Sequence, residues 1–265
     1  MGIGQFAGAL TCPVCGSVLA FEPGRAACPR RHSFDIARQG YLNLLNGPQP
    51  KNADTWAMLA ARGRVHDAGL FDPVADAVAA AVSGARTILE AGAGTAHYLA
   101  RCLDAGVGLD ARKGLALDVS TAAARVAAKR PRVAAVVADV WKTLPLADAG
   151  FDAVLCVFAP RNLAEFARVL RPGGRLIAVT PNPGHLAAVR SAHALLAIPA
   201  DKGAALERPP FELVDAVAVR YAVPLSRAQV ADLIAMGPNA FHHPPANTLA
   251  VEDHVDVTVW TLERR

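Results

Sequence analysis

Three cysteines and a histidine near the N-terminus follow a spacing that few folds use. Cys12 and Cys15 are separated by two residues, Cys28 and His32 by three, and twelve residues lie between the pairs. Two close ligands that bind one side of an ion, followed by a second pair that completes a tetrahedron, are typical of structural zinc sites. We therefore expect a small zinc-ribbon-like module whose Zn²⁺ ligands are these four side chains. The alternatives are a disulfide pair and four unrelated side chains.

Composition favours the metal over the disulfide. The remaining cysteines, Cys102 and Cys156, are single and lie far apart in apolar segments. This usage suits a reducing cytoplasm, where clustered cysteines hold metal more often than they form disulfides. The first eleven residues lack the basic start and apolar core of a secretory signal, and no apolar run approaches the roughly 18 residues of a membrane span. We expect a cytoplasmic protein with no membrane partner.

Gly47, Pro48 and Pro50 lie among polar neighbours, a composition typical of linkers. This segment divides the chain into an N-terminal module at 1–46, a linker at 47–53 and a larger domain at 54–265.

In the larger domain, short apolar runs alternate with helical patterns, which is typical of an α/β fold with a mostly parallel sheet. The expected strands are 87–90, 114–118, 132–138, 151–158 and 174–180. Two longer strands follow, 211–223 and 254–263, with a helix between them. A hairpin-like pair after five βα units is the arrangement of class I (Rossmann-like) S-adenosylmethionine-dependent methyltransferases. We therefore expect their seven-stranded sheet.

A glycine loop follows the first of these strands. The strand ends at Glu90, and Gly92 and Gly94 precede a helix that begins near Thr95. Glycines at this point allow a tight turn and close approach of a ligand at the carboxyl edge of the sheet. Ala96 replaces the third glycine of a dinucleotide fingerprint. S-adenosylmethionine carries no phosphate, and the Glu90 carboxylate suits its cationic methionine end, so we expect this cofactor rather than a nicotinamide.

Acidic residues also end the next two strands. Asp118 is placed to accept hydrogen bonds from both ribose hydroxyls of the cofactor, and Asp139 to accept one from the adenine amino group. A carboxylate at such a position is seldom part of a core. Trp141 is expected to lie against the adenine ring, with a plain core aromatic as the alternative.

These motifs together resemble one family, the 23S rRNA guanine-N1 methyltransferases with an N-terminal zinc module. The resemblance covers nearly the whole chain and leans toward the Gram-positive branch that includes the tylosin-resistance enzyme. It rests on the segments CPVC, CPRRHSFDIARQGYLNLL, DAGLFDPV, EAGAGT, LDVS, ADVWKTLPL, VFAPRN, LRPGG, TPNPGHL and AMGPNAFHHPP.

The resemblance implies zinc at the four N-terminal ligands and cofactor contacts at Gly94, Thr95 and His185. Phe71 stands where the family commonly has a tyrosine, so stacking on the cofactor is retained without the hydroxyl. The implied activity is methyl transfer from S-adenosylmethionine to N1 of a guanine in a hairpin loop of domain II of 23S rRNA. Macrolide resistance and a homodimer with an RNA cleft are further implications.

The segment VFAPRN follows the fourth strand, where these folds present residues that bind the methyl acceptor. Phe158 and Pro160 are expected to wall the guanine, and Asn162 to read its edge. N1 carries a proton that must leave, and His242 or its neighbour His243 is a candidate to accept it. A solvent-exposed histidine pair is the alternative.

The formal net charge is +4, and arginines concentrate just after Cys28. Arg30, Arg31 and Arg38 are candidates to bind RNA phosphates, with a solvated surface as the alternative. Two rival functions keep the cofactor. One is methylation of a small molecule such as a quinone precursor, and the other is a non-catalytic regulatory protein that binds the cofactor and RNA.

Overall fold

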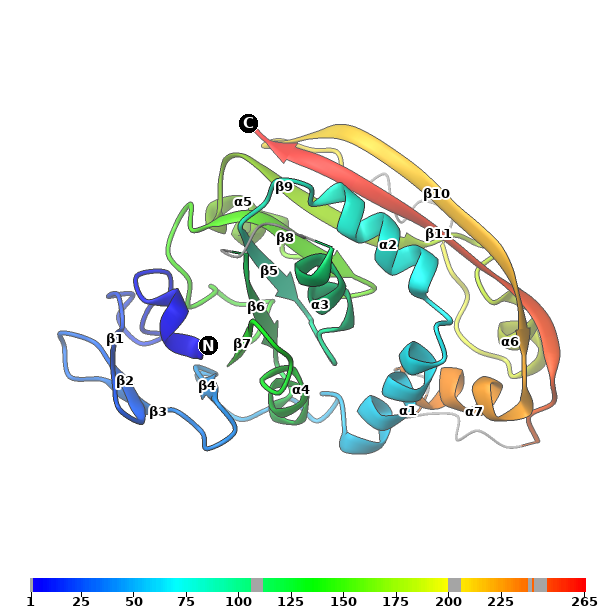
Figure 1. Cartoon of the computed structure of the whole chain (residues 1–265), viewed down its shortest axis with the longest axis horizontal. Helices are drawn as coiled ribbons and strands as arrows, with labels where there is room; N and C mark the ends of the chain where they lie inside the picture. Colours follow the sequence, from blue (N-terminus) through cyan, green and yellow to red (C-terminus); the bar gives the residue numbers. More distant parts are fainter. Residues whose placement is uncertain (1, 106–111, 200–205, 238–239, 241–246) are drawn as a thin grey trace.

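A mostly parallel sheet forms the centre of the molecule (Figure 1). The computed structural model describes residues 2–105, 112–199, 206–237, 240 and 247–265. Within them, five strands are parallel, as the alternating pattern predicts, and they run in the order β7-β6-β5-β8-β9. They are β5 Thr87–Ala91, β6 Lys113–Asp118, β7 Val133–Val137, β8 Phe151–Val157 and β9 Leu170–Pro181. Short apolar runs suit these positions because both faces of the sheet are covered.

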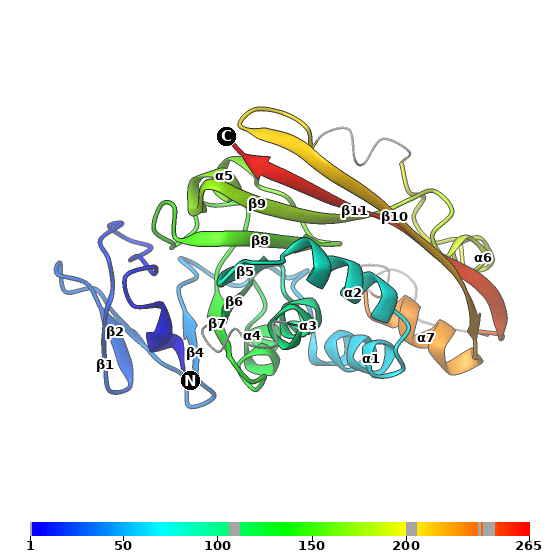
Figure 2. The ribbon, with the colours of Figure 1, turned by 45° about the horizontal axis from the view of Figure 1, so that its top comes forward.

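Two long antiparallel strands extend the sheet beyond β9. Strand β11, Val251–Arg264, pairs with β9 on one side and with the edge strand β10, Phe211–Leu225, on the other. They curve along one side of the molecule, away from the N-terminal module (Figure 2). The expected class I methyltransferase arrangement is therefore confirmed.

The opposite edge of the sheet differs from the expectation. Strand β4, Tyr41–Asn43, pairs in parallel with β7 and makes this an eight-stranded sheet within the described residues, where seven strands were expected. β7 is buried along its whole length, so its outer edge needs a hydrogen-bonding partner and an apolar cover. Tyr41 and Leu42 supply both. Residues assigned to the N-terminal module thus complete the larger sheet.

Helices cover both faces of the sheet, and consecutive strand residues face different cores. Ile88 packs in one core with Val74 and Leu99, whereas Leu89 packs in the other with Phe166. The helices are α1 Trp56–Asp67, α2 Asp72–Ala81, α3 His97–Asp104, α4 Thr121–Ala127, α5 Leu163–Val169, α6 Ala187–Ala192 and α7 Arg227–Ala235. In the part of the chain that is described, no helix is long and apolar enough to cross a membrane.

The N-terminal module packs on the second core rather than standing apart. It contains the 3-10 helix η1, Ile3–Phe6, and a three-stranded antiparallel sheet of β1 Ala20–Glu22, β2 Arg25–Ala27 and β3 Ser33–Asp35. The rings of Phe6 and Phe151 stack with centroids 6.0 Å apart. Cys12 and Cys28 belong to the same buried cluster as Leu89. The module and the sheet therefore share one hydrophobic core.

Candidate functional site

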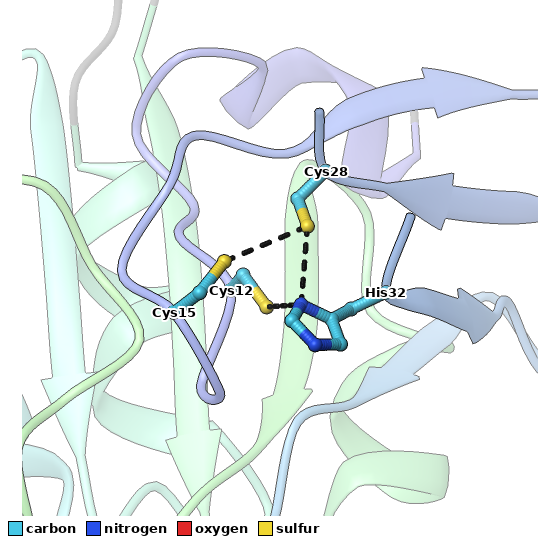
Figure 3. Close-up of side chains that lie close together, drawn as sticks. All are labelled: Cys12, Cys15, Cys28 and His32. Atoms are coloured by element: carbon cyan, nitrogen blue, oxygen red, sulfur yellow. Dashed lines mark hydrogen bonds between the residues drawn. The ribbon is translucent and has the colours of Figure 1, made fainter. Parts of the chain in front are cut away.

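The four predicted zinc ligands lie close together in the N-terminal module (Figure 3). Their ligand atoms all lie within 4.8 Å of one another. Sγ of Cys15 is 3.6 Å from Sγ of Cys28, and Nδ1 of His32 is 3.4 Å from Sγ of Cys28 and 3.5 Å from Sγ of Cys12. A tetrahedral Zn²⁺ with bonds of about 2.3 Å to sulfur and about 2.0 Å to nitrogen would separate its ligands by about 3.5–3.8 Å.

Local backbone hydrogen bonds hold this arrangement. The Gly16 amide donates to the Cys12 carbonyl, and the Arg31 amide to the Cys28 carbonyl, so a tight turn follows each cysteine. Cys12 and Cys28 are buried, and the structure contains no disulfide among its cysteines in the described residues. The donor set and its geometry fit zinc. Four protein ligands complete the coordination shell, which makes this a structural rather than a catalytic site.

The predicted RNA-binding arginines belong to this module. Arg30 and Arg31 lie between the last two zinc ligands, and Arg38 lies between β3 and β4; all three side chains are exposed. Their surface position allows contact with a phosphate backbone. The RNA-binding role of the three arginines stays a prediction.

The glycine loop is compressed between two strand ends. The amides of Gly92 and Ala93 both donate to the Leu117 carbonyl at the end of β6. Gly92 has a φ of +71°, and a Cβ placed on it would lie 2.6 Å from Cβ of Ala159 in the loop after β8. A larger residue would therefore push apart the loops that form the carboxyl edge of the sheet. Because Gly92 and Gly94 carry no side chains, an extended ligand such as S-adenosylmethionine can approach this backbone closely.

Asp118 fixes the far side of this loop. Its Oδ2 accepts a hydrogen bond from the Gly94 amide at 2.8 Å, and its Oδ1 accepts one from the Ser120 amide at 2.8 Å. Burial raises the pKa of this carboxyl. Each carboxylate oxygen keeps a second lone pair, so ribose hydroxyls can still donate to it. Asp118 thus has a position suited to the predicted ribose contact and also holds the glycine loop in shape.

Glu90 is a buried carboxyl at the end of β5. Its Oε2 accepts a hydrogen bond from the Leu99 amide in the first turn of α3, 3.2 Å away. Burial raises its pKa to about 8, although hydrogen bonding to that amide and the charge of Arg130 oppose the rise. The side chain is therefore mostly protonated at neutral pH in the cofactor-free protein. Its predicted place at the cationic methionine end stays a prediction.

The Glu90 pKa gives a stability prediction. Between its ordinary value of 4.5 and about 8, folded protein holds a proton that the unfolded chain has released. The free energy of unfolding should therefore fall as pH rises through this window. Glu90→Gln should remove this component, which is about 3 kcal/mol between pH 5.5 and 8.5. Urea unfolding of both proteins across this range measures it, and parallel pH profiles would contradict the prediction.

Asp139 and Trp141 lie in the loop after β7. Oδ1 of Asp139 accepts a hydrogen bond from the Trp141 amide at 3.0 Å. The Trp141 side chain is 66% exposed, so the alternative of a core aromatic is wrong. Contacts of either residue with adenine stay predictions.

Phe71, Phe158 and His185, which the sequence analysis predicted from separate motifs, form one aromatic cluster. The His185 ring stacks on Phe158 with centroids 5.8 Å apart, and Phe71 lies 5.9 Å from Phe158 and 6.1 Å from His185. Burial lowers the pKa of His185 to about 4, so its ring is neutral at pH 7. Its Nδ1 accepts a hydrogen bond from the Asp256 amide at 3.2 Å, which leaves the proton on Nε2. The cluster thus offers apolar ring faces and one fixed donor.

A small cleft of about 110 Å³ opens beside this cluster, between the ends of β8 and β9. It is lined by Phe158, Ala159, Arg161, Val179, Thr180 and Pro181. Oγ1 of Thr180 accepts a hydrogen bond from the Trp260 indole at 2.9 Å, which ties the cleft to β11. Pro160 is exposed next to it. The cleft lies where class I folds present the methyl acceptor, so it is a candidate base-binding surface.

Asn162 has a structural role, at the N-terminus of α5, that the sequence analysis did not predict. Its Oδ1 accepts a hydrogen bond from the Glu165 amide and caps α5, and its Nδ2 donates to the Val140 carbonyl at 2.9 Å. These bonds join α5 to the loop after β7. Reading of a guanine edge by the same amide stays a prediction. His242 and His243 lie outside the described residues.

Helix α1 adds two side chains that the motif search missed. Nη1 of Arg62 lies against Gly94, and Nδ1 of His66 is 3.2 Å from Oγ1 of the buried Thr95. The ring of His66 also stacks on His97 with centroids 4.0 Å apart. Residues four apart share one face of a helix, so the spacing of Arg62 and His66 in the sequence indicates that both side chains face the same surface.

The strand order, the glycine loop and the acidic strand ends define a class I S-adenosylmethionine-dependent methyltransferase with an N-terminal zinc ribbon. A family profile described as "RlmA, N-terminal" matches residues 10–52, and one described as "Methyltransferase domain" matches 88–174. The Streptomyces fradiae 23S rRNA (guanine(748)-N(1))-methyltransferase is 41% identical, covering 89% of this chain and 87% of the relative. The chain belongs to the 23S rRNA (guanine-N1)-methyltransferase family, which confirms the resemblance.

Two further relatives differ in how much of this chain they match. A Micromonospora griseorubida protein assigned to the 23S rRNA (guanine-N(1)-)-methyltransferases is 42% identical, over 91% of this chain and 90% of its own length. The demethylmenaquinone methyltransferase of Renibacterium salmoninarum is 35% identical over 137 residues, which are 48% of this chain and 55% of the relative. The Streptomyces and Micromonospora relatives therefore match nearly the whole chain, whereas the Renibacterium relative matches about half of it.

Proposed function

We propose that this protein transfers a methyl group from S-adenosylmethionine to N1 of a guanine in 23S rRNA. The observation that carries the proposal is a complete zinc ligand set joined to a class I methyltransferase site through one core, in a chain related along its length to rRNA-modifying proteins. A small-molecule enzyme of this fold has no evident use for such a module.

The reaction needs alignment more than covalent catalysis. S-adenosylmethionine, when bound, supplies the electrophilic methyl group, and attack by N1 must be in line at about 3–3.5 Å. In this proposal Phe158 and Pro160 wall the guanine beside the cleft, and the rings of Phe71 and His185 pack against Phe158. The N1 proton needs an acceptor, worth about two to four orders of magnitude in rate. His242 is our candidate.

Access to N1 constrains the RNA. N1 forms a Watson–Crick hydrogen bond in a helix, so the guanine must lie in a loop or be extruded. We propose a hairpin loop of domain II as the target, with Arg30, Arg31 and Arg38 binding its phosphates. A homodimer with an RNA cleft, a cytoplasmic location and a contribution to macrolide resistance belong to the same proposal.

Transfer of labelled methyl from S-adenosylmethionine to unmodified 23S rRNA tests the proposal. Methylation at N1 blocks base pairing, so primer extension should stop one nucleotide before a single guanine in the domain II hairpin. A transcript with adenine at that position is the matched control and should accept no label. Activity should fall steeply with added salt, because phosphate contacts release counterions. Cofactor binding without transfer to rRNA would contradict the proposal.

The partial match to a demethylmenaquinone methyltransferase favours one second candidate, methylation of a quinone precursor. The same labelled cofactor with demethylmenaquinone tests it, and salt-insensitive transfer would support it. Measurable turnover on rRNA would exclude a purely regulatory protein that binds the cofactor and RNA.

A further inference from the structure

We infer that Arg62 binds the carboxylate of the methionine moiety of S-adenosylmethionine. This inference rests on the proposed cofactor and adds the cation that the predicted site lacks. The other polar residues predicted around the cofactor carry no positive charge at neutral pH. Glu90, Asp118 and Asp139 are carboxyls, Thr95 and Trp141 are uncharged, and the ring of His185 is neutral. The methionine end of the cofactor carries a carboxylate beside its amino group, and a carboxylate entering a largely buried site needs a positive partner.

Arg62 comes from α1 and lies directly over the glycine loop. A Cβ placed on Gly94 would clash with its Nη1, so the guanidinium lies where a ligand resting on the loop must meet it. Its side chain is 22% exposed, which leaves it accessible from one side but mostly withdrawn from water. Burial raises the pKa of both Glu90 and Asp118, and the positive charge of Arg62 opposes part of that rise, as expected for a group that faces the same space.

The existing contacts orient the guanidinium and leave donors for a ligand. Nη1 donates to Oδ2 of Asp54 at 2.5 Å, and Nη2 donates to the Met236 carbonyl at 2.5 Å. A guanidinium carries five N–H groups in a planar fork that matches a carboxylate, so three remain beyond these two bonds. Asp54 and the end of α7 therefore hold Arg62 in place over Gly94.

The other arginine near the loop has a different position. Nε of Arg130 donates to the Thr95 carbonyl at 2.6 Å. Arg130 therefore binds the backbone of the loop itself. Arg62 instead lies against Gly94, whose amide donates a hydrogen bond to Asp118. Arg62 is accordingly the residue that we assign to the ligand carboxylate.

The test compares two ligands that differ only in this carboxylate, S-adenosylmethionine and decarboxylated S-adenosylmethionine, by calorimetric titration of the full chain. Wild-type protein should prefer the intact cofactor. Arg62→Ala should weaken S-adenosylmethionine binding about 10- to 100-fold and change binding of the decarboxylated ligand by no more than about 3-fold. Arg62→Lys should retain part of the preference, since it keeps the charge without the fork.

Arg64→Ala is the matched control. Arg64 lies on the same helix, is 61% exposed and pairs with Asp232 of α7, so its loss removes a similar interhelical contact outside the site. It should leave both affinities at wild-type values. Equal weakening of both ligands by Arg62→Ala, or no weakening, would overturn the assignment. Protein that binds S-adenosylmethionine with this selectivity but leaves rRNA unmethylated would contradict the proposed function alone.

Discussion

Cys28→Ser is expected to abolish zinc binding and to weaken binding of the rRNA hairpin about 10-fold or more, because three predicted phosphate contacts lose their rigid support. Cys28 is a buried ligand 3.4 Å from Nδ1 of His32 and 3.6 Å from Sγ of Cys15. Binding of structural zinc contributes about 10–16 kcal/mol in zinc-finger peptides, so a ribbon of this size depends on its ion. Affinity for S-adenosylmethionine should stay nearly unchanged, since the glycine loop lies on the larger sheet.

Metal analysis, RNA binding and cofactor titration measured on the same preparation check this prediction. Cys102→Ser is the matched control, because it removes a buried thiol of α3 that lies outside the zinc cluster. Its zinc content and RNA affinity should equal those of the wild type. Equal losses of RNA and cofactor affinity in Cys28→Ser would instead mean that the ribbon and the sheet unfold together. The stacking of Phe6 on Phe151 couples the N-terminal module to β8 and would explain joint unfolding.

The second large effect is expected at Asp118. Asp118→Ala should lower the affinity for S-adenosylmethionine about 100-fold or more. The substitution leaves the amides of Gly94 and Ser120 without their acceptor, at about 1–3 kcal/mol for each buried donor, and removes the predicted partner of the ribose hydroxyls. The S-adenosylmethionine affinity of Asp118→Asn should lie between those of the wild type and Asp118→Ala. The asparagine oxygen can still accept one hydrogen bond from a backbone amide, but its amide nitrogen cannot accept the other.

Asp152→Ala separates cofactor binding from general stability. Asp152 also accepts hydrogen bonds from two backbone amides, those of Arg86 at 2.7 Å and Thr87 at 2.9 Å, but at the start of β8, away from the glycine loop. It should lower the melting temperature and leave cofactor affinity intact. Equal cofactor affinities for Asp118→Ala and Asp152→Ala would refute the assignment of Asp118.

The sequence by itself determined those features whose geometry is local. Spacing alone brings Cys12 and Cys15 to one ion, because a tight turn between them is set by neighbouring residues. Glycines at Gly92 and Gly94 predict the sharp turn after β5, and both adopt positive φ. The carboxyl ends of parallel strands meet at one edge of a sheet, so the order of elements also predicted that Glu90, the glycine loop and Asp118 lie together.

Only the tertiary structure decided the contacts between distant segments. β4 completes the large sheet because the buried strand β7 needs an edge partner, and no local pattern shows which segment supplies it. The amide of Asn162 holds α5 to the loop after β7 because packing brings the Val140 carbonyl within reach. Arg62 meets Gly94 because α1 lies over the glycine loop. Such contacts depend on how helices and strands pack, which residue spacing along the chain does not specify.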